Sequence, residues 1–375
     1  MQDFANSTGL TGSPQHRRRY LWTDAFAVCN YLELYRQSDN QEYLQLAIKL
    51  VDQVHHTLGR NRENDTWLSG LTGEEAKLHP TLGGLRIGKQ LDERGTNEPF
   101  DDRLEWERDG QYFHYLTKWM HALNRVSRVT HNGVYNQWAM ELAQVSHQAF
   151  TYTSGKDDAK KMVWKMSIDL SRPLIDSMGQ HDPLDGLITY QELVSTSALF
   201  PDTKNKIDLK AEIDDLVTMC SGHDWGTPDS LGIGGLLSDA YRLVQLISKN
   251  QLRDDDMLKS LLQDIDFSLQ AFIKHNTLNL SAKNRLAFRE LGLAIGLYAI
   301  PEMQTAIKQD TGSFTHINQL NILLTQLLRF YPLCDLIKDF WTETKHRTVN
   351  TWTEHADINN VMLATCLAPG SYLKI

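Results

Sequence analysis

The segment "SMGQHDPLDGLITYQEL", residues 177–193, places several acid–base groups directly before an apolar helical pattern. An amide (Gln180), an imidazole (His181) and two carboxylates (Asp182 and Asp185) stand close together in it. A carboxylate followed by proline suits a helix start, because the carboxylate accepts unpaired backbone N–H groups and proline is tolerated in the first turn. Capping does not explain His181 or Gln180, so the segment is a candidate catalytic site.

Similar groups occur where other helical patterns begin. The candidates that share this position are Trp106, Asp109, Tyr112, His114, Trp225, Trp352 and His355. Asp24 and Glu290 are expected about two turns inside their helices, where a charged side chain is unusual unless it faces a polar cavity. Carboxylates beside aromatic rings suit sugar hydrolysis, in which one acid protonates the leaving oxygen and one base activates water. Each aspartate taken singly also fits a helix cap, and it is the concentration of these groups that indicates a site.

The elements that carry these groups are expected to be helices. Apolar residues recur at three- and four-residue steps, which is typical of a buried helix face. Examples are the series Leu21, Ala25, Val28, Leu32, Tyr35 and the series Tyr112, Leu116, Trp119, Leu123, Val126. Only residues 161–170 alternate at period two, and they predict a short strand.

The helices are expected in pairs, and the pairs repeat. "YLQLAIKLVDQVHH" at 43–56 aligns with "YNQWAMELAQVSHQ" at 135–148, with Tyr, Ala, Leu and His in register. Helical hairpins bury their apolar faces by stacking on neighbouring hairpins. Long connections, 59–108 and 151–181, precede the first helices of pairs, and long connections in a compact domain are often functional. We therefore expect these two insertions, together with the loop 222–228, on one rim.

This organisation resembles a known superfamily. First helices are expected to begin near Arg17, Asp109, Asp182, Asp229, Lys283 and Glu354. Their number and pairing resemble the (α/α)6 toroid of six-hairpin glycosidases and their epimerase relatives. Stretches such as "DGQYFHYLTKWMHALNR" are similar to bacterial proteins grouped with that superfamily that carry no established activity. The resemblance implies an all-α fold, with 1–375 as a single (α/α)6 toroid domain, 1–16 as an N-terminal arm and 59–108 and 151–181 as rim insertions.

Composition excludes several function classes. A net charge of -9 argues against a nucleic-acid partner, because phosphate binding needs a basic face. No window approaches the ~18 apolar residues of a membrane span, and the N-terminal residues lack the pattern of a secretory signal. Four widely spaced cysteines fit a reducing cytoplasm and no zinc ribbon. "GIGG" at 232–235 lacks the preceding strand of a dinucleotide site, so we expect neither a metal nor a cofactor.

These observations favour a carbohydrate-active enzyme with a small carbohydrate ligand. As a glycoside hydrolase it would use Asp182 as general acid and Asp109 as general base. A helix N-terminus lowers a carboxyl pKa, so this role requires burial of Asp182 or a nearby second carboxylate such as Asp185 to raise it. Two alternatives are an epimerase of the N-acylglucosamine 2-epimerase type, using His181 and His355, and a non-catalytic helical-repeat binding protein.

The charge of the ligand is predicted from arginines near the rim. Guanidinium groups bind carboxylates through paired hydrogen bonds. The arginines in or near rim segments are Arg17, Arg18, Arg19, Arg86, Arg103 and Arg289. They predict an acidic group on the ligand, with Arg289 as the residue to test.

Overall fold

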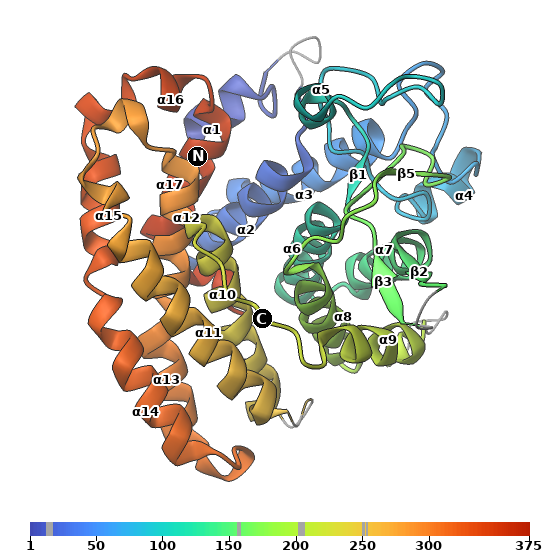
Figure 1. Ribbon diagram of the computed structural model, residues 1–375. Helices are drawn as coiled ribbons and strands as arrows, with labels where there is room; N and C mark the ends of the chain where they lie inside the picture. The colour runs from blue at the N-terminus through green and yellow to red at the C-terminus, as the bar shows by residue number, and fades with distance from the viewer. Residues whose placement is uncertain (13–17, 156–158, 202–206, 250–251, 253) are drawn as a thin grey trace. The chain divides into compact units, whose positions relative to one another are not determined.

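The computed structural model describes the chain except residues 13–17, 156–158, 202–206, 250–251 and 253 (Figure 1). Arg17, where the first long helix was expected to begin, lies outside the described residues. The chain divides into two compact units, residues 5–221 and residues 222–375 with 1–4. The single toroid domain stays a prediction.

The unit 5–221 is built from three helical hairpins. They are α2 (Leu21–Ser38) with α3 (Gln41–Leu58), α6 (Phe113–Thr130) with α7 (Gly133–Phe150), and α8 (Asp182–Ser197) with α9 (Lys210–Cys220). Within each hairpin the two helices pack together, and α6 also packs against α2 and α8. The short turns work because Asp39 and His131 adopt the left-handed conformation at the ends of α2 and α6, and Asn40 and Asn132 then cap α3 and α7.

The two insertions of this unit form small irregular elements that contact each other. The first insertion contains α4 (Gly73–Leu78) and α5 (Asp102–Glu107), and the second contains the hairpin of β2 (Thr151–Thr153) and β3 (Lys160–Met162). The second also contains β4 (Lys165–Met166) and β5 (Pro173–Ile175), which form an antiparallel sheet with β1 (Gln111–Tyr112), the strand directly before α6. Lys165 pairs with Tyr112 across β4 and β1. Arg94 donates to the carbonyl of Leu174 at 3.0 Å, which joins the first insertion to the second. The period-two pattern at 161–170 therefore gives two short strands, β3 and β4, where one was expected.

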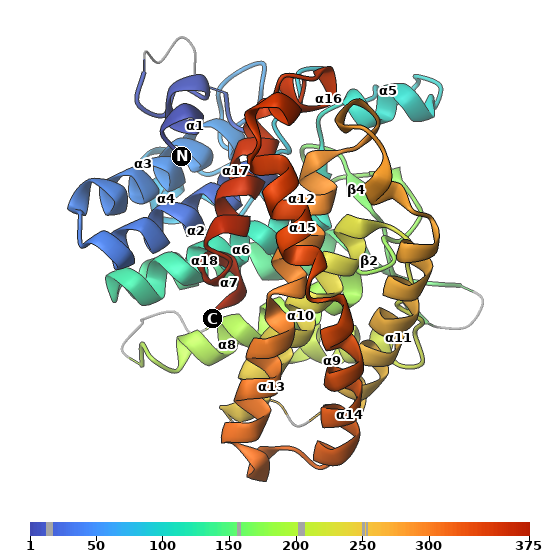
Figure 2. The same cartoon turned by 90° about the vertical axis from the view of Figure 1, so that its left-hand side faces the viewer.

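The unit 222–375 is also helical (Figure 2). Its long helices are α10 (Ser230–Ser248), α11 (Asp255–Lys274), α12 (Ala287–Leu297), α13 (Ala299–Gln309), α14 (Ile317–Leu327), α15 (Leu333–Thr342) and α17 (Ala356–Leu367). Short helices are α1 (Gln2–Ser7), which spans the division between the units, α16 (Asn350–Thr353) and α18 (Gly370–Leu373). The 3-10 turns are η2 (Thr277–Asn279), η3 (Ala282–Asn284), η4 (Thr311–Ser313), η5 (Leu328–Phe330) and η6 (Thr344–Arg347). α10 packs on α11, α12 and α13, and α12 packs on α15 and α17.

The predicted all-α class is confirmed by the structure of each unit, whereas the closed ring of six hairpins stays a prediction. The expected first helices are α2, α6, α8, α10, α12 and α17. α8 begins at Asp182 and α10 at Ser230, as expected, whereas α6 begins at Phe113 and not near Asp109.

One stretch among the described residues, Ile317–Thr342, is long and apolar enough to cross a membrane by length and composition. It is divided into α14, η5 and α15, with Pro332 directly before α15, and core helices of soluble proteins pass the same test. The absence of a membrane partner stays a prediction.

The glycines of "GIGG" have a packing role. A Cβ on Gly234 would lie 2.5 Å from the carbonyl carbon of Gly292, and a Cβ on Gly296 would lie 2.5 Å from the carbonyl oxygen of Gly234. α10 and α12 therefore approach backbone to backbone at this point. A Cβ on Gly235, the next residue, would meet no atom within 4 Å.

This contrast predicts opposite effects of the same substitution at neighbouring positions. Gly234→Ala should lower the free energy of unfolding by about 1–3 kcal/mol, because the helices must separate. Gly235→Ala should raise it by up to about 1 kcal/mol, because alanine is the better helix former. Urea titrations of both variants measure the difference, and equal effects would contradict the close crossing.

Candidate functional site

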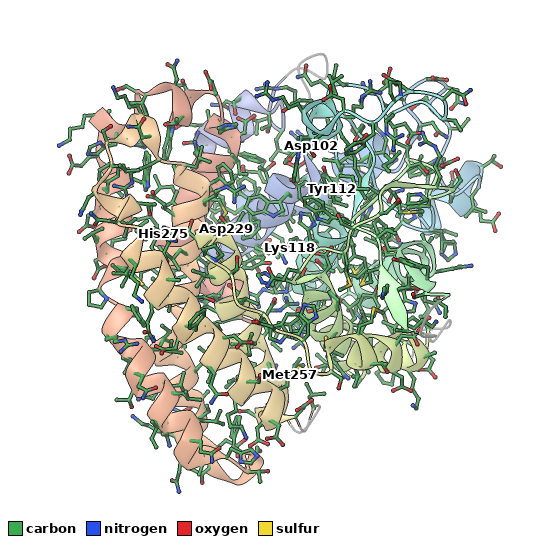
Figure 3. The ribbon with its side chains drawn as sticks, viewed as in Figure 1. Asp102, Tyr112, Lys118, Asp229, Met257 and His275 are labelled. Carbon is green, nitrogen blue, oxygen red and sulfur yellow. The ribbon has the colours of Figure 1, made fainter. Side chains whose placement is uncertain are left out.

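Polar side chains of α6 and α8 meet at the N-terminal ends of both helices. His114, Thr117 and Lys118 are spaced three and four residues apart on α6, and Asp182 and Asp185 are spaced three apart on α8, so each set shares one helix face. Nδ1 of His114 lies 3.8 Å from Oδ1 of Asp182. Nζ of Lys118, which Figure 3 labels, lies 2.7 Å from Oδ2 of Asp185. Thr117 also donates to Oδ2 of Asp185.

Asp182 is a buried carboxyl group with a raised pKa. The residue is 5% exposed, and its Oδ2 has no hydrogen-bond partner among the described residues. Burial, assisted by the charge of Asp185 and opposed by that of Lys118, raises the pKa of Asp182 to about 7. Burial thus outweighs the helix N-terminus, and the carboxyl group can both give and take a proton near neutral pH.

The local chain makes room for this carboxyl group. The N-cap of α8 is His181, and Asp182 is the first helical residue. The side chain of Asp182 therefore does not have the N-cap role that the sequence suggested as an alternative to catalysis. A Cβ on Gly179 would lie 2.6 Å from Cγ of Asp182. Glycine at 179 is therefore needed for the observed position of the carboxyl group.

His114 is a neutral imidazole at neutral pH. Burial, together with the nearby charge of Lys118, lowers its pKa to about 3, although Asp185 acts in the opposite direction. The indole N–H of Trp164 donates to Nδ1 of His114 at 3.3 Å. The side chain of His114 remains 28% exposed, so it is accessible to a ligand.

Aromatic rings extend this cluster. The ring centroids of Trp164 and Trp106 are 4.8 Å apart, and that of Tyr112 lies 5.4 Å from His114 in a stacked arrangement. Trp106 is 41% exposed, whereas Tyr112 is 2% exposed and its hydroxyl has no hydrogen-bond partner among the described residues. The site thus combines two acid–base groups, Asp182 and His114, with the exposed aromatic ring of Trp106.

Asp109 occupies a different environment. It is fully buried, and its Oδ2 accepts hydrogen bonds from Arg86 at 2.5 Å and Arg62 at 3.2 Å. Its Oδ1 accepts from the backbone N–H of Gly88 at 2.9 Å. It precedes β1 and not a helix, so the expectation that it begins an inner helix is corrected. With both oxygens bonded, Asp109 fixes the first insertion to β1.

Two candidates occupy first turns that hold ion pairs. Asp24 lies in the first turn of α2, not two turns inside it, and it accepts from the backbone N–H of Tyr20 at 3.0 Å. Glu290 lies in the first turn of α12 and binds Arg285 at 2.6 Å and the indole of Trp341 at 2.8 Å. Their polar partners explain the buried charges without a ligand.

The other candidates of the unit 222–375 have local partners of their own. Trp225 is 2% exposed and Trp352 4% exposed, so neither offers a free ring face for sugar stacking, and both expectations are corrected. His355 lies edge-on to Phe288 at 5.9 Å. Arg289 forms an ion pair with Asp229 at 2.6 Å. These residues belong to a separate unit from His114 and Asp182.

Sequence reasoning missed three residues of the site, Thr117, Lys118 and Trp164. Lys118 follows His114 by one helical turn, and this spacing was the available signal. Trp164 had no such signal, because it lies outside the helices and reaches His114 only through the pairing of β4 with β1. Gln180 and His181 lie beside Asp182, as expected from the chain. No group of three or more His, Cys, Asp or Glu side chains that could hold a metal occurs among the described residues.

Comparisons with known proteins found similarity to solved sugar epimerases. A cellobiose 2-epimerase from Bacillus thermoamylovorans B4167 has 12% sequence identity and a TM-score of 0.46, with 84% of this chain and 76% of that chain covered. A sugar epimerase from a ruminal bacterium has 11% identity, a TM-score of 0.48 and coverage of 93% and 88%. A cellobiose 2-epimerase from Spirochaeta thermophila DSM 6192 has 10% identity, a TM-score of 0.49 and coverage of 95% and 87%. No family model matches the sequence, and the search of curated proteins found no match.

Proposed function

We propose that this protein is a carbohydrate-active enzyme that moves a proton on a carbon atom beside the carbonyl group of a sugar, as an epimerase or isomerase. The observation that carries the proposal is the pair formed by Asp182 and His114, a carboxyl group with a pKa raised to about 7 beside a neutral imidazole. This assignment replaces the hydrolase as the leading hypothesis, and it uses His114 in place of His181 and His355.

The two groups divide the chemistry between them. Ionised Asp182 takes the proton from the carbon, the C–H electron pair moves into a carbon–carbon double bond, and the carbonyl oxygen becomes an enolate oxygen. The N–H of neutral His114 donates to that oxygen and stabilises its developing charge. Asp182 can then return the proton to the former carbonyl carbon while the hydroxyl proton on the neighbouring carbon moves to the former carbonyl oxygen, which gives an isomer. An epimer forms when the enolate turns its opposite face to Asp182 before the proton returns to the original carbon.

The other carboxyl groups around the site argue for this division. Glycoside hydrolysis needs a second working carboxyl group ~5–10 Å from the first. Asp185 is held by Lys118 and Thr117, Glu105 by Lys165 at 2.8 Å, and Asp109 by Arg86. Each of these carboxylates is paired with a cation, whereas Oδ2 of Asp182 has no hydrogen-bond partner among the described residues.

One observation still favours the hydrolase as a second candidate. A raised carboxyl pKa is also what the general acid of a glycosidase needs. The two functions use opposite protonation states of Asp182, so their pH dependences have opposite signs.

The ligand is proposed to be a sugar that rests on Trp106. The acidic group on the ligand stays a prediction, although three of the arginines behind it have carboxylate neighbours: Arg86 pairs with Asp109, Arg289 pairs with Asp229, and Arg19 lies 3.5 Å from Asp24. A neutral sugar is therefore the first class to test.

The pH dependence of turnover tests the proposed function. A panel of reducing sugars is incubated with the protein, and epimers and isomers are separated by chromatography between pH 5 and 9. For a base with a pKa of about 7, kcat/KM should rise through pH 7 and then level off, while His114, with a pKa of about 3, adds no step in this range. A hydrolase that uses Asp182 as general acid would instead lose activity above pH 7 on glycosides. Absence of any conversion, with sugars bound all the same, would favour the binding protein.

A further inference from the structure

Trp164 makes one hydrogen bond that selects between two forms of His114. A neutral imidazole carries a single proton, on either Nδ1 or Nε2, and the partner of one nitrogen decides where the proton is. The indole N–H can only donate. Because Nε1 of Trp164 donates to Nδ1 of His114 at 3.3 Å, Nδ1 must present its lone pair. The proton of the neutral ring is then on Nε2.

A second group competes for the same nitrogen. Oδ1 of Asp182 lies 3.8 Å from Nδ1 of His114. An ionised carboxylate accepts hydrogen bonds strongly, so without the indole it would draw the imidazole proton to Nδ1. That arrangement would engage Asp182 in a histidine–aspartate bond. The indole therefore decides whether the carboxylate is bonded to the imidazole or is available to a substrate.

The position of Trp164 is well fixed. Its backbone N–H donates to the carbonyl of Ile175 at 3.3 Å, and the next residue, Lys165, pairs with Tyr112 of β1. Its ring packs against Trp106 at 4.8 Å and Tyr112 at 5.6 Å between centroids. The buried ammonium group of Lys165 binds Glu105 of α5 at 2.8 Å, which ties the strand to the first insertion. Both insertions thus hold the indole against the start of α6.

We propose that Trp164 is a positioning residue that holds His114 as the tautomer with its proton on Nε2. This keeps Nε2–H as the hydrogen-bond donor toward a substrate oxygen and keeps Asp182 free of a bond to the imidazole. The assignment of the His114 tautomer does not depend on which reaction the protein catalyses. The effect of Trp164 on turnover rests on the proposed function.

The tautomer can be measured without a substrate. In protein labelled with 15N-histidine, the 15N shifts of the two ring nitrogens show which one carries the proton, and His114→Gln identifies the His114 signals by their loss. We expect protonated Nε2 and unprotonated Nδ1 in the unsubstituted protein at pH 8. Trp164→Phe keeps an aromatic ring and removes the donor, and should move the population toward Nδ1–H.

The matched control is Trp106→Phe, a tryptophan in ring contact with Trp164 that has no hydrogen bond to His114 among those found for the described residues. It should leave the His114 tautomer unchanged. The proposal would be overturned if His114 were protonated on Nδ1 in the unsubstituted protein. It would also be overturned if Trp164→Phe, like Trp106→Phe, left the tautomer unchanged. Circular dichroism confirms that both variants are folded.

Turnover separates this inference from the proposed function. With a sugar that the enzyme converts, Trp164→Phe should lower kcat on the order of 10-fold with a smaller change in KM, as expected for one lost hydrogen bond in the positioning of a catalytic group. A KM effect alone would make Trp164 a binding residue and overturn its positioning role. If no sugar is converted while the tautomer responds as expected, the proposed function fails and the tautomer assignment stands.

Discussion

Asp182→Asn is expected to lower turnover ~10²–10⁴-fold, the usual contribution of a general acid–base group. Asparagine keeps the shape of the side chain and removes its titration, so the variant cannot take the proton from the substrate. The measurement is kcat/KM of the purified variant on a sugar that the unsubstituted enzyme converts. Asp102→Asn, a substitution of the same type at an exposed position of α5, is the control and should keep full activity.

The stability of Asp182→Asn should show that its loss of turnover comes from the missing acid–base group and not from unfolding. The pKa of Asp182 is raised in the folded protein from its usual value of 3.8 to about 7, so the folded state binds this proton more tightly than the unfolded state. The stability that this proton contributes is fully present below about pH 4 and is lost as the pH rises through 7. Relative to Asp182→Asn, the unsubstituted protein should therefore lose stability between pH 4 and 8. Equal activity of the two proteins would remove Asp182 from the mechanism.

Asp109→Ala is expected to lower the free energy of unfolding by about 3–5 kcal/mol, because it leaves the buried guanidinium group of Arg86 without its carboxylate. Arg86 is 8% exposed and Asp109 is fully buried, so water cannot replace the lost partner. The measurement is a urea titration at pH 7. If Asp109 were instead a catalytic base, the variant would keep its stability and lose only turnover, and the hydrolase hypothesis would regain its second carboxylate.

Asp92→Ala provides the matched control for this prediction. Asp92 binds the other arginine of the cluster, Arg62, at 2.7 Å, but its side chain is 80% exposed. An exposed ion pair contributes about 0–1 kcal/mol, so Asp92→Ala should change the stability little. The difference between the two variants isolates the effect of burial.

The helices could be predicted because their apolar periods are local. The repeat that aligns residues 43–56 with 135–148 corresponds to α3 and α7, and Asn40 and Asn132 cap them in the same way. The start of α8 could be predicted from Asp182 and Pro183. The start of α6 could not be predicted from Asp109, because arginines far away in the sequence bind that carboxylate before the helix begins.

The site was predictable only in part, because some of its contacts join residues that lie far apart in the sequence. The sequence places Asp182 three residues after Gly179 and His114 one helical turn before Lys118. It also shows that Asp182 needs burial or a second carboxylate to raise its pKa. Burial itself depends on the packing of α6 against α8. Trp225 and Trp352 stand in segments that suggested free rings, yet the surrounding chain covers both. Trp164 reaches His114 through a two-residue strand, which a single sequence does not specify.

Deuterium exchange tests the central claim most directly. A reducing sugar is incubated with the enzyme in D2O, and NMR follows the hydrogen on the carbon beside the carbonyl group. We predict that the unsubstituted enzyme and Asp102→Asn replace this hydrogen by deuterium, and that Asp182→Asn does so at least ~10²-fold more slowly. Exchange at the same rate in Asp182→Asn, or release of sugar from a glycoside without any exchange at this carbon, would contradict the account.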